Sequence, residues 1–187
     1  MAVTSGDFPT RPGAHATWLR PASRADLPAL HEMRRAAERW LAGKGTDQYQ
    51  SAASSAKARV NITELVAARH FVIHTNSAGD LLATAALTAA DLDFWNDGDD
   101  LACAWYLSRL MVSQHGCDWG GRLLDLVCAG AATTALAYLR LDCWRDNFAL
   151  HDYYRAHGFN LVRIEAVSGR RSGALMQRPL LDALPQQ

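Results

Sequence analysis

The chain has 187 residues, 49% of them hydrophobic and 20% charged, and its 19 basic and 19 acidic side chains give a formal net charge of +0. One domain is the best expectation at this length, and the balanced charge argues against a nucleic-acid-binding protein, which usually carries a basic excess. The longest uncharged, mostly apolar run, residues 126–139, is too short to span a bilayer, so no membrane partner is expected.

Residues 1–15 combine Pro, Gly, Ser and Thr without periodicity, which predicts a flexible N-terminal tail ahead of a single domain at residues 16–187. This start has no apolar segment typical of a signal peptide. The four cysteines form no Cys-x-x-Cys pair, so no metal site is expected. Free thiols are typical of a reducing compartment, which predicts a cytoplasmic protein.

The first half of the chain predicts a strand, two helices and a hairpin. Ser23 is followed by Asp26 three positions later, which resembles a capping box, and apolar residues then recur at helical spacing until Gly43. The remaining elements are a strand at 17–20, a helix at 55–69, a strand at 70–75, a turn at 76–80 and a strand at 81–89.

The second half alternates strands and helices. An acidic loop at 91–100 carries Phe94 and Trp95. The elements after it are a strand at 102–112, a helix at 120–135, a strand at 138–143, a helix at 147–157 that ends at Gly158, and strands at 159–164 and 174–178. This order predicts an α/β fold with a mixed sheet.

The turn after the strand at 102–112 contains Gly116, Gly120 and Gly121 and leads directly into a helix. Free backbone N–H groups and the helix dipole make such a helix start a candidate anion site. A tight strand-to-helix turn is the plainer interpretation, and the glycines alone do not separate the two. Neither a Walker loop nor a Gly-x-Gly-x-x-Gly motif is present.

The block from Tyr106 to Phe159 resembles the GNAT superfamily of N-acetyltransferases. The matching features are the strand at 107–112, the glycine turn ahead of Arg122-Leu-Leu, the strand at 139–142, Asn147, and Tyr154-x-x-x-Gly158-Phe159. The resemblance implies a mixed, mostly antiparallel sheet flanked by helices, with a splay between the fourth and fifth strands. These two strands are the segments at 102–112 and 138–143.

The resemblance implies an acyltransferase that uses acetyl-CoA as a co-substrate. The acetyl group would move to a primary amine of a small molecule or an amino terminus, by direct attack in a ternary complex. Tyr154 would protonate the leaving thiolate, and a homodimer is one expected assembly. The implied cofactor-binding residues are Leu110, Met111, Val112, His115, Gly116, Cys117, Asp118, Trp119, Gly120, Gly121, Arg122, Asn147 and Tyr154.

The turn departs from the family pattern in two ways. Asp118 stands where the family has glycine, and the turn is shorter than usual between Val112 and Leu123. An anion beside a phosphate site would weaken cofactor binding. The alternative function is therefore a catalytically inactive GNAT-fold module that binds acyl-CoA or a protein partner.

The acceptor side is less defined. Candidate substrate-binding residues are Trp40, Gln48, Tyr49, Trp95 and His151, and each is weighed against ordinary packing or, for His151, against a satisfied polar role. No general base is assigned, because a water relay is preferred over each of the candidates Glu64, His74, Asp91, Asp93 and Asp142. Cys143 is not expected to act as a nucleophile, since no His and carboxylate are placed to activate it.

Overall fold

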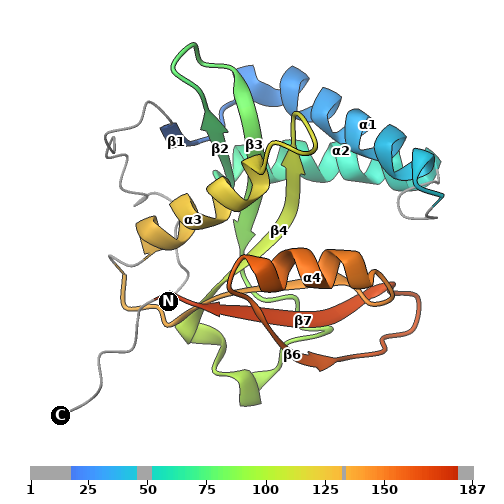
Figure 1. The fold of residues 1–187 in the computed structure, drawn as a ribbon, viewed down its shortest axis with the longest axis vertical. Helices are drawn as coiled ribbons and strands as arrows, with labels where there is room; N and C mark the ends of the chain where they lie inside the picture. Colours follow the sequence, from blue (N-terminus) through green and yellow to red (C-terminus); the bar gives the residue numbers. More distant parts are fainter. Residues whose placement is uncertain (1–17, 46–51, 132–133, 181–187) are drawn as a thin grey trace. The chain divides into compact units, whose positions relative to one another are not determined.

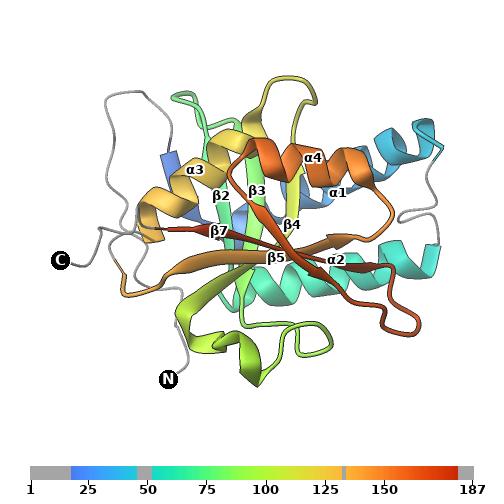
Figure 2. The same ribbon diagram turned by 60° about the horizontal axis from the view of Figure 1, so that its bottom comes forward.

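The computed structural model describes residues 18–45, 52–131 and 134–180, and its elements follow the order expected from the sequence (Figures 1 and 2). The strands are β1 Trp18–Pro21, β2 Phe71–Thr75, β3 Leu81–Thr88, β4 Ala104–Val112, β5 Tyr138–Trp144, β6 Asn160–Ile164 and β7 Ser172–Pro179. The α-helices are α1 Leu27–Gly43, α2 Ala52–Ala67, α3 Trp119–Ala131 and α4 Phe148–Ala156, with short 3-10 turns at Arg24–Asp26, Asp97–Asp99 and Leu101–Cys103. None of the helices in these described stretches is both long and apolar enough to cross a bilayer.

The strands form a seven-stranded sheet in the order β1-β2-β3-β4-β5-β7-β6. β1–β2, β2–β3, β5–β7 and β6–β7 are antiparallel, whereas β4–β5 is parallel, so the predicted mixed, mostly antiparallel sheet is confirmed. The parallel register ends at Tyr106 and Arg140, although β5 continues against β7 as far as Trp144. Such an early end is what the predicted splay between the fourth and fifth strands requires.

The chain divides into two compact units. The first consists of Met1–Ala86 with Arg109–Leu123, and the second of Leu87–Ser108 with Leu124–Gln187. The first unit therefore contains the end of β4, the turn after it and the start of α3. The expectation of one domain at 16–187 stays a prediction, and the expected tail at 1–15 lies outside the described residues.

The core of the first unit lies where α1 and α2 pack on β2 and β3 (Figure 1). Its buried members are Ala22, Leu30, Met33, Ile62, Val66, Phe71, Ile73, Ala86 and Met111. The predicted capping box is present, because the Asp26 carboxylate accepts hydrogen bonds from the Ser23 N–H at 2.7 Å and the Ser23 hydroxyl at 2.9 Å. Helix α1 thus starts where the sequence predicts.

The core of the second unit gathers Phe94, Trp95, Ala104, Tyr106 and Leu175. The Arg163 guanidinium holds the loop before β4 to β6 by donating to both carboxylate oxygens of Asp99, at 2.6 and 2.8 Å. Gly173 is the second residue of β7, where an added Cβ would lie 2.1 Å from the Glu165 carbonyl oxygen. Only glycine fits the backbone at that position.

Candidate functional site

The turn between β4 and α3 belongs to the first unit. The Ser113 N–H donates to the Leu82 carbonyl at 2.9 Å, which anchors the start of the turn on β3. Gly116 and Asp118 then adopt left-handed backbone conformations, with φ of 85° and 51°. The Asp118 carbonyl accepts the N–H of Arg122 at 3.1 Å as α3 begins. Two left-handed residues thus reverse the chain between strand and helix within a few positions.

The conformation of Asp118 explains how a non-glycine residue stands at the glycine position of the motif. Aspartate and asparagine are the side-chain-bearing residues that tolerate the left-handed region best. The backbone therefore keeps a shape that glycine would give it. The side chain is exposed and still places a carboxylate at the turn.

The start of α3 has the features of an anion site. The first N–H groups of a helix have no partner inside the helix, and the dipole places partial positive charge there. Gly120 and Gly121 are buried, whereas His115, Gly116 and Arg122 are exposed. The Arg122 guanidinium lies over the Trp119 ring, 4.9 Å from its centroid, and adds a full positive charge to the first turn.

The structure brings together two residues that the sequence assigned to different ligands. Trp40, near the end of α1, stacks on His115 of the turn. The Lys44 ammonium lies 5.5 Å from the Trp40 ring centroid. Burial, and secondarily the charge of Lys44, lower the pKa of His115 below its usual range. The candidate acceptor residue Trp40 and the candidate cofactor residue His115 therefore form one surface of the first unit.

His74 lies beneath the same turn, and sequence reasoning gave it only a minor place among the candidate bases. Its side chain is fully buried in β2, and neither ring nitrogen has a hydrogen-bond partner among the described residues. The ring meets Trp119 edge-to-face with centroids 6.0 Å apart. Burial and the charge of Arg122 lower the pKa of His74. The alternation of β2, with Phe71 and Ile73 in the core beneath α1 and α2, is the signal that places His74 on the other face.

Leu110, Met111 and Val112 form the end of β4 that the family resemblance assigns to the pantetheine arm. Met111 is buried in the core of the first unit, whereas Leu110 and Val112 are half-buried. Just before them, Arg109 has a left-handed φ of 54° within the strand. A left-handed residue inside a strand interrupts regular pairing, as in a β-bulge.

Helix α4, which carries the candidate residues His151 and Tyr154, lies in the second unit. His151 and Tyr154 are buried, and Asn147 caps the helix by accepting the Leu150 N–H at 3.0 Å through its side-chain oxygen. The His151 ring nitrogen Nε2 lies 2.9 Å from the Trp144 carbonyl oxygen. That contact favours the satisfied polar role for His151. The Tyr154 ring packs edge-to-face on Phe159, with centroids 5.5 Å apart.

Trp95, another candidate acceptor residue, is only 1% exposed. Its ring meets Tyr106 at 5.7 Å and lies beneath the guanidinium of Arg140 at 4.9 Å. This environment favours the packing role that was weighed for it. The candidates Gln48 and Tyr49 lie outside the described residues.

Two polar groups of β5 have perturbed pKa values. Burial raises the pKa of the Cys143 thiol to about 12, which keeps it protonated and agrees with its rejection as a nucleophile. Burial also raises the pKa of Asp142, and nearby Asp91 raises it further. Arg170, from the turn between β6 and β7, forms ion pairs with Asp91 and Asp93. No residue pattern predicts this link between two distant loops.

No protein-family model matches the chain. A curated relative from Bacillus subtilis (strain 168), the uncharacterised N-acetyltransferase YesJ, is 29% identical over 133 residues, which cover 68% of this chain and 72% of the relative. A GNAT-family acetyltransferase from Listeria monocytogenes is 22% identical with a TM-score of 0.69, and the match covers 90% of this chain and 98% of that one.

A GNAT-superfamily phosphinothricin acetyltransferase from Sinorhizobium meliloti, solved in complex with acetyl-CoA, is also similar in structure. It is 18% identical, with a TM-score of 0.59, and the match covers 92% of each chain. The likeness thus extends well beyond the segment that carries the sequence motifs. The resemblance predicted from the block at 106–159 is confirmed, and this chain has the fold of the GNAT superfamily of N-acetyltransferases.

Proposed function

We propose that this chain is an enzyme that transfers the acetyl group of acetyl-CoA to a primary amine, carried by a small molecule or by an amino terminus. The relative from Bacillus subtilis is an N-acetyltransferase by name, and the Sinorhizobium meliloti neighbour was solved with acetyl-CoA. Both support the expected class, an acyltransferase with acetyl-CoA as co-substrate.

The observation that carries the proposal is the turn with left-handed Gly116 and Asp118 that opens α3. It leaves the amides of the first turn of a 13-residue helix without intrahelical partners, next to Arg122. The pyrophosphate of acetyl-CoA is an anion suited to such a helix start. In this proposal the main chain from His115 to Arg122 holds the pyrophosphate, and Asp118 weakens the binding without preventing it.

The end of β4 takes the second part of the cofactor. The pantetheine arm contains amides of its own, which can pair with backbone groups of Leu110, Met111 and Val112 that a neighbouring strand does not satisfy. Acetyl-CoA supplies the thioester. The chain's own role is to hold that arm in an extended form and to leave a backbone N–H for the oxyanion.

Tyr154 is the proposed general acid, and its hydroxyl protonates the thiolate as the acceptor amine displaces it. Packing on Phe159 fixes the ring. Asn147, at the start of the same helix, is proposed to contact the cofactor with the part of its amide that does not cap α4. The acceptor amine loses its proton to a water relay, so no side chain is assigned as the base.

The cellular compartment, the acceptor-binding residues and the assembly of the chain also remain proposals. All four cysteines are free thiols, which supports a reducing compartment and hence the cytoplasm. Trp40, which is 42% exposed, is the acceptor-side residue best placed to meet a ligand among the described candidates. A homodimer stays a prediction.

Calorimetric titration with acetyl-CoA tests the cofactor site directly, with CoA and a longer acyl-CoA as controls. We expect saturable binding that prefers the acetyl form, followed by turnover in a screen of small primary amines and peptides with free amino termini. Saturable binding without turnover of any amine would favour the inactive module. An absence of binding at millimolar acetyl-CoA would overturn the proposal that this chain is an acetyltransferase.

A further inference from the structure

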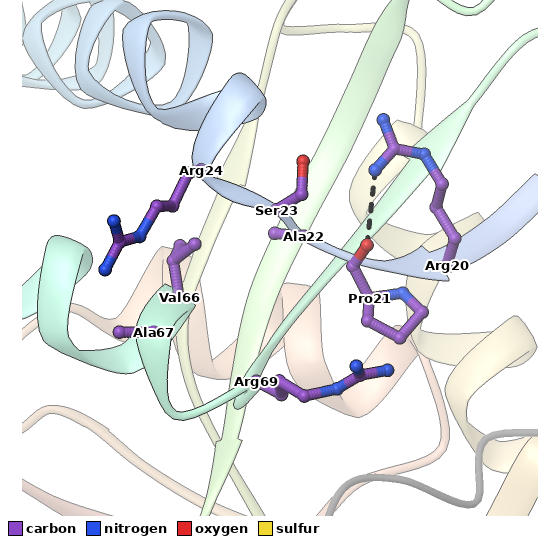
Figure 3. A pocket seen from close by; sticks show the side chains of 8 residues that line it. All are labelled: Arg20, Pro21, Ala22, Ser23, Arg24, Val66, Ala67 and Arg69. Atoms are coloured by element: carbon purple, nitrogen blue, oxygen red, sulfur yellow. Dashed lines mark hydrogen bonds between the residues drawn. The ribbon is translucent and has the colours of Figure 1, made fainter.

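A hollow of about 420 Å³ in the first unit lies between the residues that join β1 to α1 and the end of α2 (Figure 3). Arg20 at its rim is already paired, because it donates to both carboxylate oxygens of Asp26, at 2.9 and 2.8 Å. The side chains of Arg24 and Arg69 extend away from each other. Ligand sites have polar groups that converge, so this hollow does not have the features of an anion site. A stronger candidate for a contact surface lies in the second unit.

The strand β6 of the second unit carries exposed apolar side chains. Leu161, Val162 and Ile164 are 36%, 39% and 52% exposed, so three of its five residues are large, apolar and accessible to solvent. In β2, which also has five residues, every residue is buried. A cluster of exposed apolar side chains on a folded protein marks a surface that contacts another molecule.

β6 is also the last strand of the sheet, whose order ends in β5-β7-β6 (Figure 1). One of its edges pairs with β7, and no other strand in the described part of the chain pairs with the opposite edge. Such an edge presents backbone N–H and C=O groups to a further strand. Lys and Pro, which commonly protect edge strands from pairing, are absent from β6.

The sequence along this edge is self-complementary when two copies meet antiparallel. With Ile164 opposite Ile164 at the centre, Arg163 of one copy lies opposite Glu165 of the other. Opposite charges and apolar pairs across antiparallel strands stabilise the pairing. The remaining pairs of this register are apolar on both sides, namely Val162 with Ala166 and Leu161 with Val167.

The charges select this register over its neighbours. Centring the pair on Arg163 or on Glu165 would place like charges directly opposite, which destabilises a strand pair. Centring it between Ile164 and either neighbour would place a charged residue opposite an apolar one. A segment that matches its own reverse in this way identifies a second copy of this chain as the partner, because each copy supplies the same surface.

The two charged side chains are already held in place. The Nε of Arg163 donates to Oε1 of Glu165 at 2.7 Å, and its terminal nitrogens donate to Asp99 at 2.6 and 2.8 Å. The Glu165 side chain is still 41% exposed, and its other carboxylate oxygen can accept a hydrogen bond from the second copy. Side chains that are ordered before association lose less entropy when they bind.

The edge is not regular along its whole length. The register of β6 against β7 shifts between Leu161 and Arg163, which leaves Val162 without a partner on β7. The hairpin continues beyond the strand, because the Glu165 N–H donates to the Gly173 carbonyl at 2.8 Å. A bulge twists an edge and limits continuous backbone pairing. The contact therefore rests on the short segment around Ile164 and on apolar side chains, and a small interface of this kind gives a reversible dimer.

We propose that β6 binds the β6 strand of a second copy of this chain, antiparallel and about a two-fold axis at Ile164. The interface is closed, because each copy uses its one exposed β6 edge on the other, so association stops at two copies. The proposal does not depend on the acetyltransferase activity.

Sedimentation equilibrium of the full chain, from micromolar to millimolar concentration, tests the proposal. We expect the mass to rise toward that of two chains, and Ile164→Lys to stay monomeric because two lysines would meet at the axis. Glu165→Gln should weaken association by about three- to tenfold, since the Arg163–Glu165 pair occurs twice in the interface. Val60→Lys is the matched control, because Val60 is 59% exposed on α2 of the first unit, and it should leave association unchanged.

Hydrogen exchange of the backbone amides at 162–165 gives a second readout, and it should slow as the protein concentration rises. If Ile164→Lys does not fold, Glu165→Gln and this exchange measurement carry the test. The mass of one chain at every concentration would overturn the proposal, and slow exchange in that monomer would show that a segment of the same chain covers β6.

Three further results would also overturn the two-fold contact at β6. A dimer that Ile164→Lys leaves intact would place the interface elsewhere. Equal weakening by Val60→Lys would show that the association does not depend on this strand. A mass that grows beyond two chains would show open-ended association through an unprotected edge.

Discussion

Trp40 and His115 lie face to face, with ring centroids 3.9 Å apart and ring planes inclined by 12°. The contact joins the end of α1 to the turn that we propose for the pyrophosphate. The Trp40 ring covers one face of the imidazole, and burial lowers the pKa of His115 although the residue is exposed. The two rings therefore link the proposed acceptor side to the proposed cofactor side within one unit.

Trp40→Ala should raise the pKa of His115 toward its ordinary value, because burial is the main cause of its lowering. An NMR pH titration of the imidazole signals measures the change. Trp40→Phe is the control, since a phenyl ring still covers His115. An unchanged pKa in the alanine variant would show that other groups bury the imidazole.

Tyr154→Phe should lower the turnover number by about a hundredfold or more, the range of a lost general acid, and leave the affinity for acetyl-CoA nearly unchanged. Phenylalanine keeps the ring that packs on Phe159, so this packing is retained. Steady-state kinetics and calorimetry on the same preparation separate the two quantities. Equal losses of turnover and affinity would contradict the acid role, and Tyr153→Phe serves as the neighbouring control.

Asp118→Gly should tighten acetyl-CoA binding by about two- to fivefold, because it removes an anion from the start of α3. Asp118→Asn is the matched variant, since asparagine also tolerates the left-handed φ of 51° but carries no charge. Calorimetric titrations at low and high salt compare them. The gain in affinity for acetyl-CoA should be smaller at high salt in both variants, because salt screens the charge of Asp118 in the wild-type chain. A loss of affinity in both variants would instead show that the carboxylate supports the turn.

His74 should make the protein less stable as the pH falls below neutrality. Its pKa in the folded chain is below the ordinary value of 6.5, so the unfolded chain binds the proton more readily. The stability that neutral His74 contributes to the folded chain is fully present above the ordinary pKa of 6.5. It is lost as the pH falls from there toward the lower pKa that His74 has in the folded chain. Urea unfolding between about pH 7.5 and 5.5 measures the slope. His74→Leu should flatten it, and an unchanged slope would assign the effect to other groups.

Gly173→Ala and Gly169→Ala should differ sharply in stability although both lie in the hairpin of β6 and β7. An added Cβ at Gly173 meets the Glu165 carbonyl oxygen at 2.1 Å, so we expect a loss of about 4 kcal/mol or more. At Gly169 the added atom meets nothing within 4 Å, and only the positive φ of 73° opposes it, at about 1 kcal/mol. Denaturant unfolding compares the two, and similar losses would contradict the steric explanation.

The elements of this fold were predictable because local patterns determine them. Apolar spacing indicated α1, and Ser23 with Asp26 marked its start, as the structure confirms. The end of α2 was placed too late, at Arg69 instead of Ala67, because an arginine in a left-handed cap gives no sequence signal. The glycines predicted the turn between β4 and α3, but no residue pattern predicted the left-handed conformation of Asp118.

Contacts between distant segments were the part that the sequence could not predict. Nothing in the residues around Trp40 indicates that it stacks on His115, and nothing in the acidic loop indicates that Trp95 is buried beneath Arg140. An aromatic residue in a loop has the same local pattern whether it packs or binds a ligand. The assignments of individual cofactor and acceptor residues therefore stay predictions.

The interleaving of the two units in the sequence has a consequence for synthesis on the ribosome. The first unit needs Arg109–Leu123, yet the second begins at Leu87, so part of the second emerges before the first is complete. Until Met111 has emerged, the nascent first unit lacks one member of its core. Neither unit can be released from the other by cutting a single peptide bond, and a truncated transcript that ends near Ala86 encodes a chain with an incomplete core.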